Sequence, residues 1–175
     1  MQFELHPTTG GFVGGQSRAV LELISGRANL PVTSYQPEAV SGLKGKPTLM
    51  SNAETFAQVA ALQAAGLASY SAIGTADEPG TRLLSVAADG PGGVVLEVPH
   101  GQPLAEVLRL CGYEVDQPVL MGGYHGSWLS AEQVQQATVS PAGLAPFQAR
   151  LGAGVILPML PGDCPVAFTA QIVSY

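Results

Sequence analysis

The stretch "TRLLSVAADGPGGVVLEVPHG" (residues 81–101) decides the fold. Two runs rich in Val and Leu, 82–88 and 94–98, flank a segment of Gly, Pro and Asp. Aliphatic and β-branched runs on either side of such a turn are typical of a β-hairpin. We therefore expect two antiparallel strands to open the second half of the chain.

The sequence after the hairpin predicts a helix and then further strands. In "PLAEVLRLCG" (103–112) the apolar residues fall on one helical face: Leu104, Val107, Leu108 and Cys111. "PVLMGGYHGSWL" (118–129) predicts a strand, a glycine turn and another strand. A hairpin, a helix and then strands is the element order of a β-grasp (ubiquitin-like) unit, which we assign to residues 80–140.

The start of the chain predicts a strand, a glycine loop and a helix, in that order. "QFELH" (2–6) alternates apolar and polar residues, as a short strand does. The Gly-rich turn 8–15 leads into "QSRAVLELISG" (16–26), whose apolar residues have helical spacing. Gly26 is typical of a helix end.

A connector without periodicity follows at 27–46. "PTLM" (47–50) then predicts a short strand before the helix 52–66. Alternating strands and helices favour an α/β layer. Residues 1–79 are therefore assigned to a partial α/β segment, and the whole chain to the α+β class.

The remaining residues, 141–175, predict a linker and the start of a helical region. "AGLAPFQARLG" (142–152) is expected to be helical, and "VILP" (155–158) to be a strand. A last helix is expected from Pro165, since proline is favoured at the first helical position. The chain ends inside this predicted helix, as a truncated sequence would.

Composition narrows the function classes. Only 11% of the residues are charged, 46% are hydrophobic, and the formal net charge is −6. The seven Lys and Arg residues do not cluster, so we exclude a nucleic-acid binder. Apolar runs are far shorter than the roughly 20 residues of a membrane span, and no signal-peptide pattern opens the chain. We expect no membrane insertion and a cytoplasmic location.

Metal and nucleophile patterns are weak. Cys111 and Cys164 lie in unrelated contexts, which favours two reduced thiols. His6, His100 and His125 have no metal-ligand spacing. We therefore predict no catalytic residue and no metal ligand within the chain. The aromatic cluster around His125 is either an exposed turn or part of a small binding surface.

Several quoted segments together resemble a known family. They are "FVGGQSRAVLELISGR" (12–27), "GKPTLMSNAETFAQV" (45–59), "GTRLLSV" (80–86), "GVVLEVPHGQPLAEVLRLCG" (93–112) and "VLMGGYHGSWL" (119–129). Their order and intervals are similar to the NADH-binding flavoprotein subunit of respiratory complex I and of NAD-linked hydrogenases and formate dehydrogenases. The resemblance implies the end of an FMN-binding domain joined to an SLBB (soluble-ligand-binding β-grasp) domain.

The resemblance also implies candidate cofactor residues. The family's G-E-E motif falls on Gly15, Gln16 and Ser17, so both carboxylates are replaced. Its N-N-x-E-T motif falls on residues 51–55, with Ser at the first position. The cofactor-binding candidates are Gly15, Gln16, Ser17, Met50, Ser51, Asn52 and Thr55. The family's glycine-rich phosphate loop and its cysteine ligands for a 4Fe-4S cluster have no counterpart in the sequence.

Each group of candidates also has a purely structural interpretation. Gln16 or Ser17 suffices as the N-cap of a helix. Ser51 and Glu54 match S-x-x-E, a capping box that satisfies the first N–H groups of a helix. The two roles are compatible, because a capped helix start leaves other N–H groups for a ligand. Asn52 is the residue expected to donate to a flavin.

Two functions follow from these residues. In the first, the chain is part of a flavoprotein electron-transfer subunit whose parent passes electrons from NADH through FMN to a 4Fe-4S cluster. Its partners are then other subunits or domains of that complex, and these residues alone are expected to be inactive, with weak or absent FMN binding. In the second, it is a non-catalytic β-grasp module that binds a ligand or a protein and keeps a degenerate flavin site.

Overall fold

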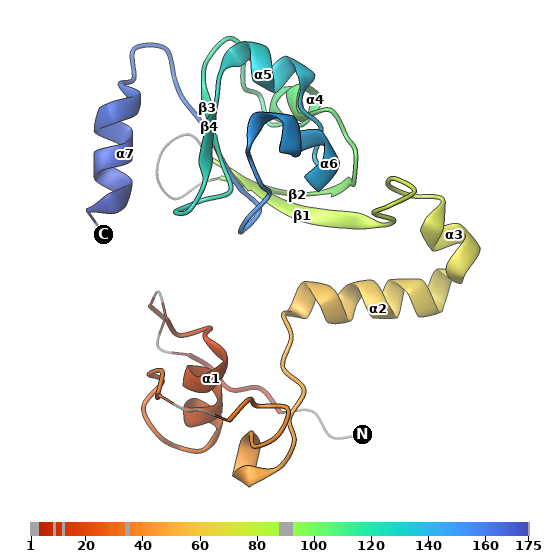
Figure 1. Cartoon of the computed structure of the whole chain (residues 1–175), viewed down its shortest axis with the longest axis vertical. Coiled ribbons are helices and arrows are strands. Elements are labelled where there is room, and N and C mark those ends of the chain that lie inside the picture. The colour runs from red at the N-terminus through yellow and green to blue at the C-terminus, as the bar shows by residue number, and fades with distance from the viewer. Residues whose placement is uncertain (1–3, 9, 12, 34–35, 88–92, 175) are drawn as a thin grey trace. The chain divides into compact units, whose positions relative to one another are not determined.

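The computed structural model describes residues 4–8, 10–11, 13–33, 36–87 and 93–174. The chain divides into two compact units (Figure 1), the N-terminal unit of residues 1–53 and the C-terminal unit of residues 54–175. The division into three parts at residues 79 and 140 stays a prediction.

The C-terminal unit is built on a mixed sheet, and its described residues form five strands in the order β2-β1-β5-β3-β4. The strands are β1 (Thr81–Val86), β2 (Val94–Pro99), β3 (Val119–Met121), β4 (Ser127–Leu129) and β5 (Val155–Pro158). β1 pairs antiparallel with β2, β3 antiparallel with β4, and β5 lies between them, parallel to β1 and antiparallel to β3. This is the β-grasp order, so the predicted hairpin, later strands and α+β class are confirmed.

Short helices lie on one side of this sheet (Figure 1). They are α4 (Leu104–Leu110), α5 (Ala131–Gln136), α6 (Pro141–Leu144) and the 3-10 turn η2 (Ala145–Phe147). Leu104, Val107 and Leu108 of α4 join the core with residues from the strands, as their spacing predicts. Helix α5, which Ser130 begins with a complete capping box, was not predicted. Only 141–147 of the predicted helical tail is helical, because Gln148 adopts a left-handed conformation.

Three helices flank the sheet in sequence: α2 (Ala53–Ala65), α3 (Leu67–Ser71) and α7 (Pro165–Val173). The predicted helices at 52–66 and from Pro165 are confirmed, and α3 was not predicted. Trp128 of β4 donates from Nε1 to Thr169 Oγ1 at 3.1 Å, which ties α7 to the sheet. Within the described ranges, each helix is too short or too polar to cross a bilayer.

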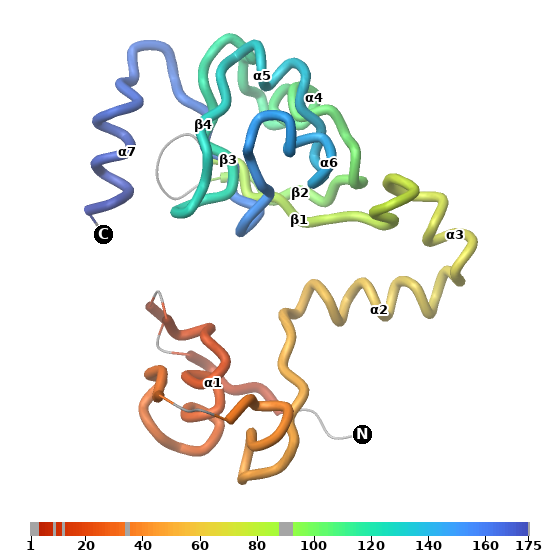
Figure 2. Tube along the Cα trace, viewed as in Figure 1, coloured from red at the N-terminus to blue at the C-terminus, as the bar shows by residue number. Residues whose placement is uncertain are grey.

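The N-terminal unit holds α1 (Ser17–Ile24) and the 3-10 turn η1 (Leu43–Gly45), which lie along the trace in Figure 2. Helix α1 confirms the helix expected at 16–26. The two predicted strands are wrong: residues 4–6 and 47–50 are not in a strand, and residues 2–3 lie outside the described part. A short strand needs a ladder partner, and the described residues of this unit form no sheet to supply one.

Candidate functional site

Gln16 caps helix α1, as the sequence predicts. Its side-chain Oε1 accepts a hydrogen bond from the Ala19 backbone N–H at 3.0 Å. The first N–H groups of a helix lack partners within the helix, so such a cap stabilises its start. One donor that would otherwise be open to an anion at this helix start is therefore occupied.

Ser17 is engaged with a carboxylate from the connector. Its hydroxyl donates to Glu38 Oε1 at 2.6 Å, and Arg18 Nε lies 3.3 Å from the same oxygen. The Ser17 hydrogen bond, a backbone hydrogen bond and the Arg18 charge hold the pKa of Glu38 below its ordinary value. A carboxylate thus lies at the first turn of α1, although positions 16 and 17 have lost theirs. The sequence pattern did not point to Glu38, because it lies in a segment without periodicity.

Asn29 fixes the glycines that lead into α1. Its Nδ2 donates to the carbonyls of Gly14, at 3.1 Å, and Ala19, at 3.0 Å. Gly14 is buried, and a Cβ there would lie 2.8 Å from Asn29 Oδ1. Gly15 is exposed, and a Cβ there would meet nothing within 4 Å. Gly14 is therefore needed for packing, whereas Gly15 leaves an open approach to the backbone.

The second group of candidates lies at the start of α2. Met50, Ser51 and Asn52 precede the helix, which begins at Ala53, and Thr55 lies in its first turn. Met50 is half-buried and the other three are exposed. Asn52, not Ser51, therefore stands directly before the helix. This start is one residue later than the capping box with Ser51 as N-cap requires.

Glu54, the acidic member of that predicted box, bonds a strand. Its carboxylate accepts a hydrogen bond from the Leu83 N–H at 2.6 Å. The capping-box interpretation would send this carboxylate back toward the N–H of Ser51 instead. The contact ties the first turn of α2 to β1 within the C-terminal unit.

The structure divides the seven predicted cofactor residues between two helix starts. Gly15, Gln16 and Ser17 begin α1, whereas the other four surround the first residue of α2. Thr55 belongs to the C-terminal unit, and the other six to the N-terminal unit. Their common role in flavin binding stays a prediction.

The side chains at α1 do not fit the phosphate of FMN. A helix start binds an anion through free N–H groups and its positive end. Here Gln16 takes one of those N–H groups, and the Glu38 carboxylate adds negative charge beside the same turn. An anionic phosphate is repelled by such a charge, so this turn is built for internal contacts.

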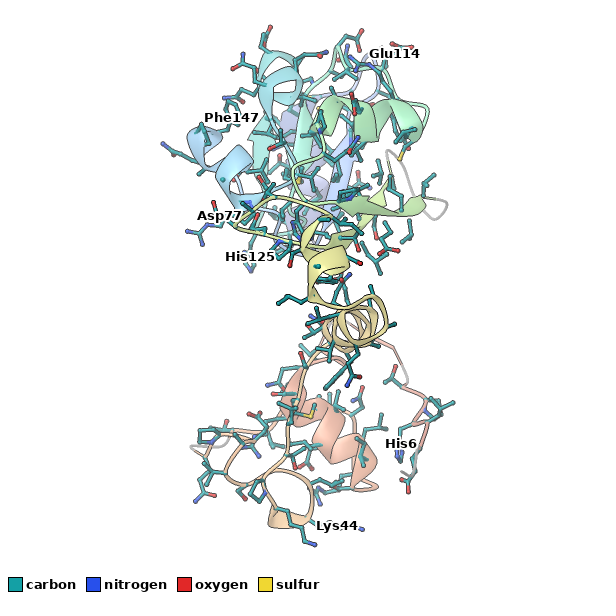
Figure 3. All side chains as sticks on the ribbon, turned by 90° about the vertical axis from the view of Figure 1, so that its right-hand side faces the viewer. His6, Lys44, Asp77, Glu114, His125 and Phe147 are labelled. Atoms are coloured by element: carbon teal, nitrogen blue, oxygen red, sulfur yellow. The ribbon has the colours of Figure 1, made fainter. Side chains whose placement is uncertain are left out.

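No metal centre is found in the part of the chain that the structure describes, where no three His, Cys, Asp or Glu side chains gather suitably. His6, at the lower right of Figure 3, pairs with Glu4 at 3.4 Å. His125 meets the Tyr124 ring edge-on, with centroids 4.9 Å apart. Both cysteines are free; Cys111 is half-buried, with a pKa raised by desolvation, and Cys164 is exposed.

Comparison with known proteins gives consistent relatives. No protein-family model matches the chain. It is 32% identical over 169 residues to the HndC component of the NADP-reducing hydrogenase of Solidesulfovibrio fructosivorans, covering 94% of the chain and 34% of that component. It is 36% identical over 121 residues to the alpha subunit of NAD-reducing hydrogenase HoxS of Cupriavidus necator, covering 69% and 20%. An NADH-quinone oxidoreductase subunit of Escherichia coli is 32% identical over 109 residues, covering 61% and 24%.

A solved structure shares the fold. A crystal structure of an NAD+-reducing NiFe hydrogenase in the H2-reduced state superposes with a TM-score of 0.74 at 28% identity, covering 91% of this chain and 27% of that one. The chain spans about a third or less of the length of the curated relatives named here. By sequence and by fold, it belongs to the family that unites these nucleotide-reducing hydrogenase subunits with their counterpart in NADH-quinone oxidoreductase.

Proposed function

We propose that the chain corresponds to the part of a flavoprotein electron-transfer subunit that joins the end of its flavin domain to a β-grasp domain. In the full-length subunit, FMN accepts a hydride from a nicotinamide nucleotide and releases single electrons toward a 4Fe-4S cluster. The residues of this chain contribute helix starts and a β-grasp scaffold. We place it in the cytoplasm, whose reducing conditions suit its free thiols.

One observation carries the proposal that these residues alone are catalytically silent. Gln16 and Ser17, at the positions of the family's two acids, make internal hydrogen bonds to Ala19 and Glu38. Their side chains are therefore committed to the fold of the N-terminal unit. Tight FMN binding then needs groups that this sequence does not contain.

Partner subunits or domains are supported by the surface of α2. No residue of this helix is buried, and Phe56 and Val59 are 49% and 53% exposed. Exposed large apolar side chains along one helix are typical of a surface that meets other protein. We propose that α2 docks against the rest of the electron-transfer subunit or complex.

Flavin titration tests the proposal. FMN fluorescence is followed as the purified chain is added, and we expect no saturable quenching at micromolar protein. The matched variant Gln16→Glu/Ser17→Glu restores the acids, and we expect it to bind FMN no more tightly, since the sequence has no counterpart of the phosphate loop. Saturable quenching of the unmodified chain at low micromolar concentration would contradict the proposal.

A second candidate is a non-catalytic β-grasp module that binds a ligand. A pocket with two arginines on the C-terminal unit favours it. The two functions differ in where they locate binding: the first uses the starts of α1 and α2, the second the β-grasp unit alone.

A further inference from the structure

A pocket of about 620 Å³ lies on the C-terminal unit, and its described lining residues include none of those that carry the flavin motifs. Its wall is formed by the start of β1, the α6–η2 turn and the segment 148–152. Phe147, labelled in Figure 3, ends this turn. The volume is within the roughly 300–1,000 Å³ range of small-molecule sites.

Arg82 is held in this pocket in a fixed orientation. Its Nη2 donates to the Gly152 carbonyl at 3.2 Å. Gly154 has a positive φ of 73°, and a Cβ there would lie 3.8 Å from both Nε and Nη2. The guanidinium therefore lies against backbone that carries no side chain. Its Nε is buried and has no hydrogen-bond partner among the described residues.

The pocket is positively charged in an acidic chain. Arg150 lines it together with Arg82, and no carboxylate is among the described lining residues. The formal net charge of the chain is −6. Arg18 and Arg27 are instead neutralised by ion pairs with Glu38 and Glu22. Two guanidinium groups on one wall repel each other unless an anion lies between them.

The remaining wall is mostly apolar. Pro141, Ala145 and Leu151 contribute to it, and Gln148 adds an amide. A buried N–H without an acceptor, two guanidinium groups and an apolar wall together describe a receptor for an amphipathic anion. Guanidinium groups bind planar or branched oxyanions through paired N–H donors.

We propose that this pocket binds a small molecule with a carboxylate or phosphate group and a compact apolar body. Its oxyanion accepts hydrogen bonds from Arg82 and Arg150, including one from the buried Arg82 Nε. Its apolar part lies against Pro141 and Ala145. This site is independent of FMN, so it stands even if the proposed electron-transfer role fails.

The test uses NMR of the arginine Nε–H resonances in the full chain, with benzoate, phenyl phosphate and inorganic phosphate as separate probes. We expect benzoate or phenyl phosphate to shift the Arg82 resonance saturably, with inorganic phosphate weaker because it lacks the apolar part. The tighter of the two aromatic probes identifies the oxyanion. Matched sodium chloride titrations control for screening.

Variants locate the binding. Arg82→Gln and Arg150→Gln should each weaken probe binding at least tenfold, and Arg109→Gln on α4, outside the pocket, should leave it unchanged. If Arg82→Gln does not fold, exposed Arg150 alone serves the test. Shifts that never saturate, or equal loss in all three variants, overturn the proposal. So does binding of a glutamate-rich peptide when the small probes fail, which would indicate an acidic protein partner.

Discussion

Glu54 and Leu83 are joined by a 2.6 Å hydrogen bond from a strand N–H to a carboxylate. Ser85 and Ala87 of the same edge donate to carbonyls of Gly154 and Ile156, at 2.8 and 3.1 Å. The Leu83 N–H points to the same side, before the first residue of β5. Helix α2 thus supplies the acceptor that β5 is too short to provide, which covers an otherwise open strand edge.

Removal of this acceptor should expose the Leu83 amide. We expect Glu54→Ala to speed hydrogen exchange at Leu83 by about tenfold, since a hydrogen bond of this kind contributes about 1 kcal/mol. Glu54→Gln keeps an acceptor and should lie between the two. Exchange at Ser85, which bonds β5, serves as the internal control. Unchanged exchange at Leu83 in Glu54→Ala would show that the contact does not protect this edge.

The Gln16 cap should stabilise helix α1. Gln16→Ala removes the acceptor for the Ala19 N–H, and loss of an N-cap costs roughly 0.5–2 kcal/mol. We expect faster amide exchange at Ala19 and Val20, with no change in α4. Gln16→Glu retains an acceptor oxygen, so its exchange should remain close to that of the unmodified chain. A cap role for Gln16 requires this difference between the two variants.

The contact between Ser17 and Glu38 should depend on pH. Because folding lowers the Glu38 pKa below the ordinary value of 4.5, the contact stabilises the N-terminal unit above that value. The stabilisation is lost as the pH falls through the folded pKa. Ser17→Ala removes the largest cause, so we expect the Glu38 pKa to rise.

Carboxyl NMR titration measures this shift. Glu132, whose pKa is lowered by a hydrogen bond from Ser130, is the control and should titrate as before. An unchanged Glu38 pKa in Ser17→Ala would mean that the hydroxyl does not hold the carboxylate.

Two leucines of α4 form a matched pair for the core. Leu108 is 0% exposed and Leu110 is 74% exposed. Leu108→Ala should lower the free energy of unfolding by about 2–5 kcal/mol, because it leaves a cavity in the packed core. Leu110→Ala should change it by about 0.5 kcal/mol or less. Urea unfolding followed by Trp128 fluorescence compares them, and equal losses would contradict this core assignment.

The sequence predicts the C-terminal unit well because its signals are local. Val and Leu runs around a Gly/Pro turn are sufficient for β1 and β2, and the spacing of Leu104, Val107 and Leu108 for α4. The sheet order depends on pairing between distant residues, and the β-grasp element order anticipated it. The short helices α3 and α5 were missed, because each has too few residues to show a period.

The N-terminal unit was predicted less well for the opposite reason. Residues 4–6 and 47–50 have strand-like patterns but no sheet to join in the described structure. Glu38 reaches Ser17 across a segment without periodicity, and no local pattern pairs the two. Arg82 gave no signal either, because its role depends on the Gly152 carbonyl, 70 residues away.

The position of β5 has a consequence for synthesis on the ribosome. This strand is the last of the sheet to be made, yet it lies in the middle and links β1 to β3. Until it has emerged, the two hairpins have no partner between them, and β1 waits for a strand whose paired residues are 70 positions downstream. Such long-range pairing slows folding and prolongs the exposure of unpaired strand edges. We expect the nascent chain to need protection from aggregation until residues 155–158 are available.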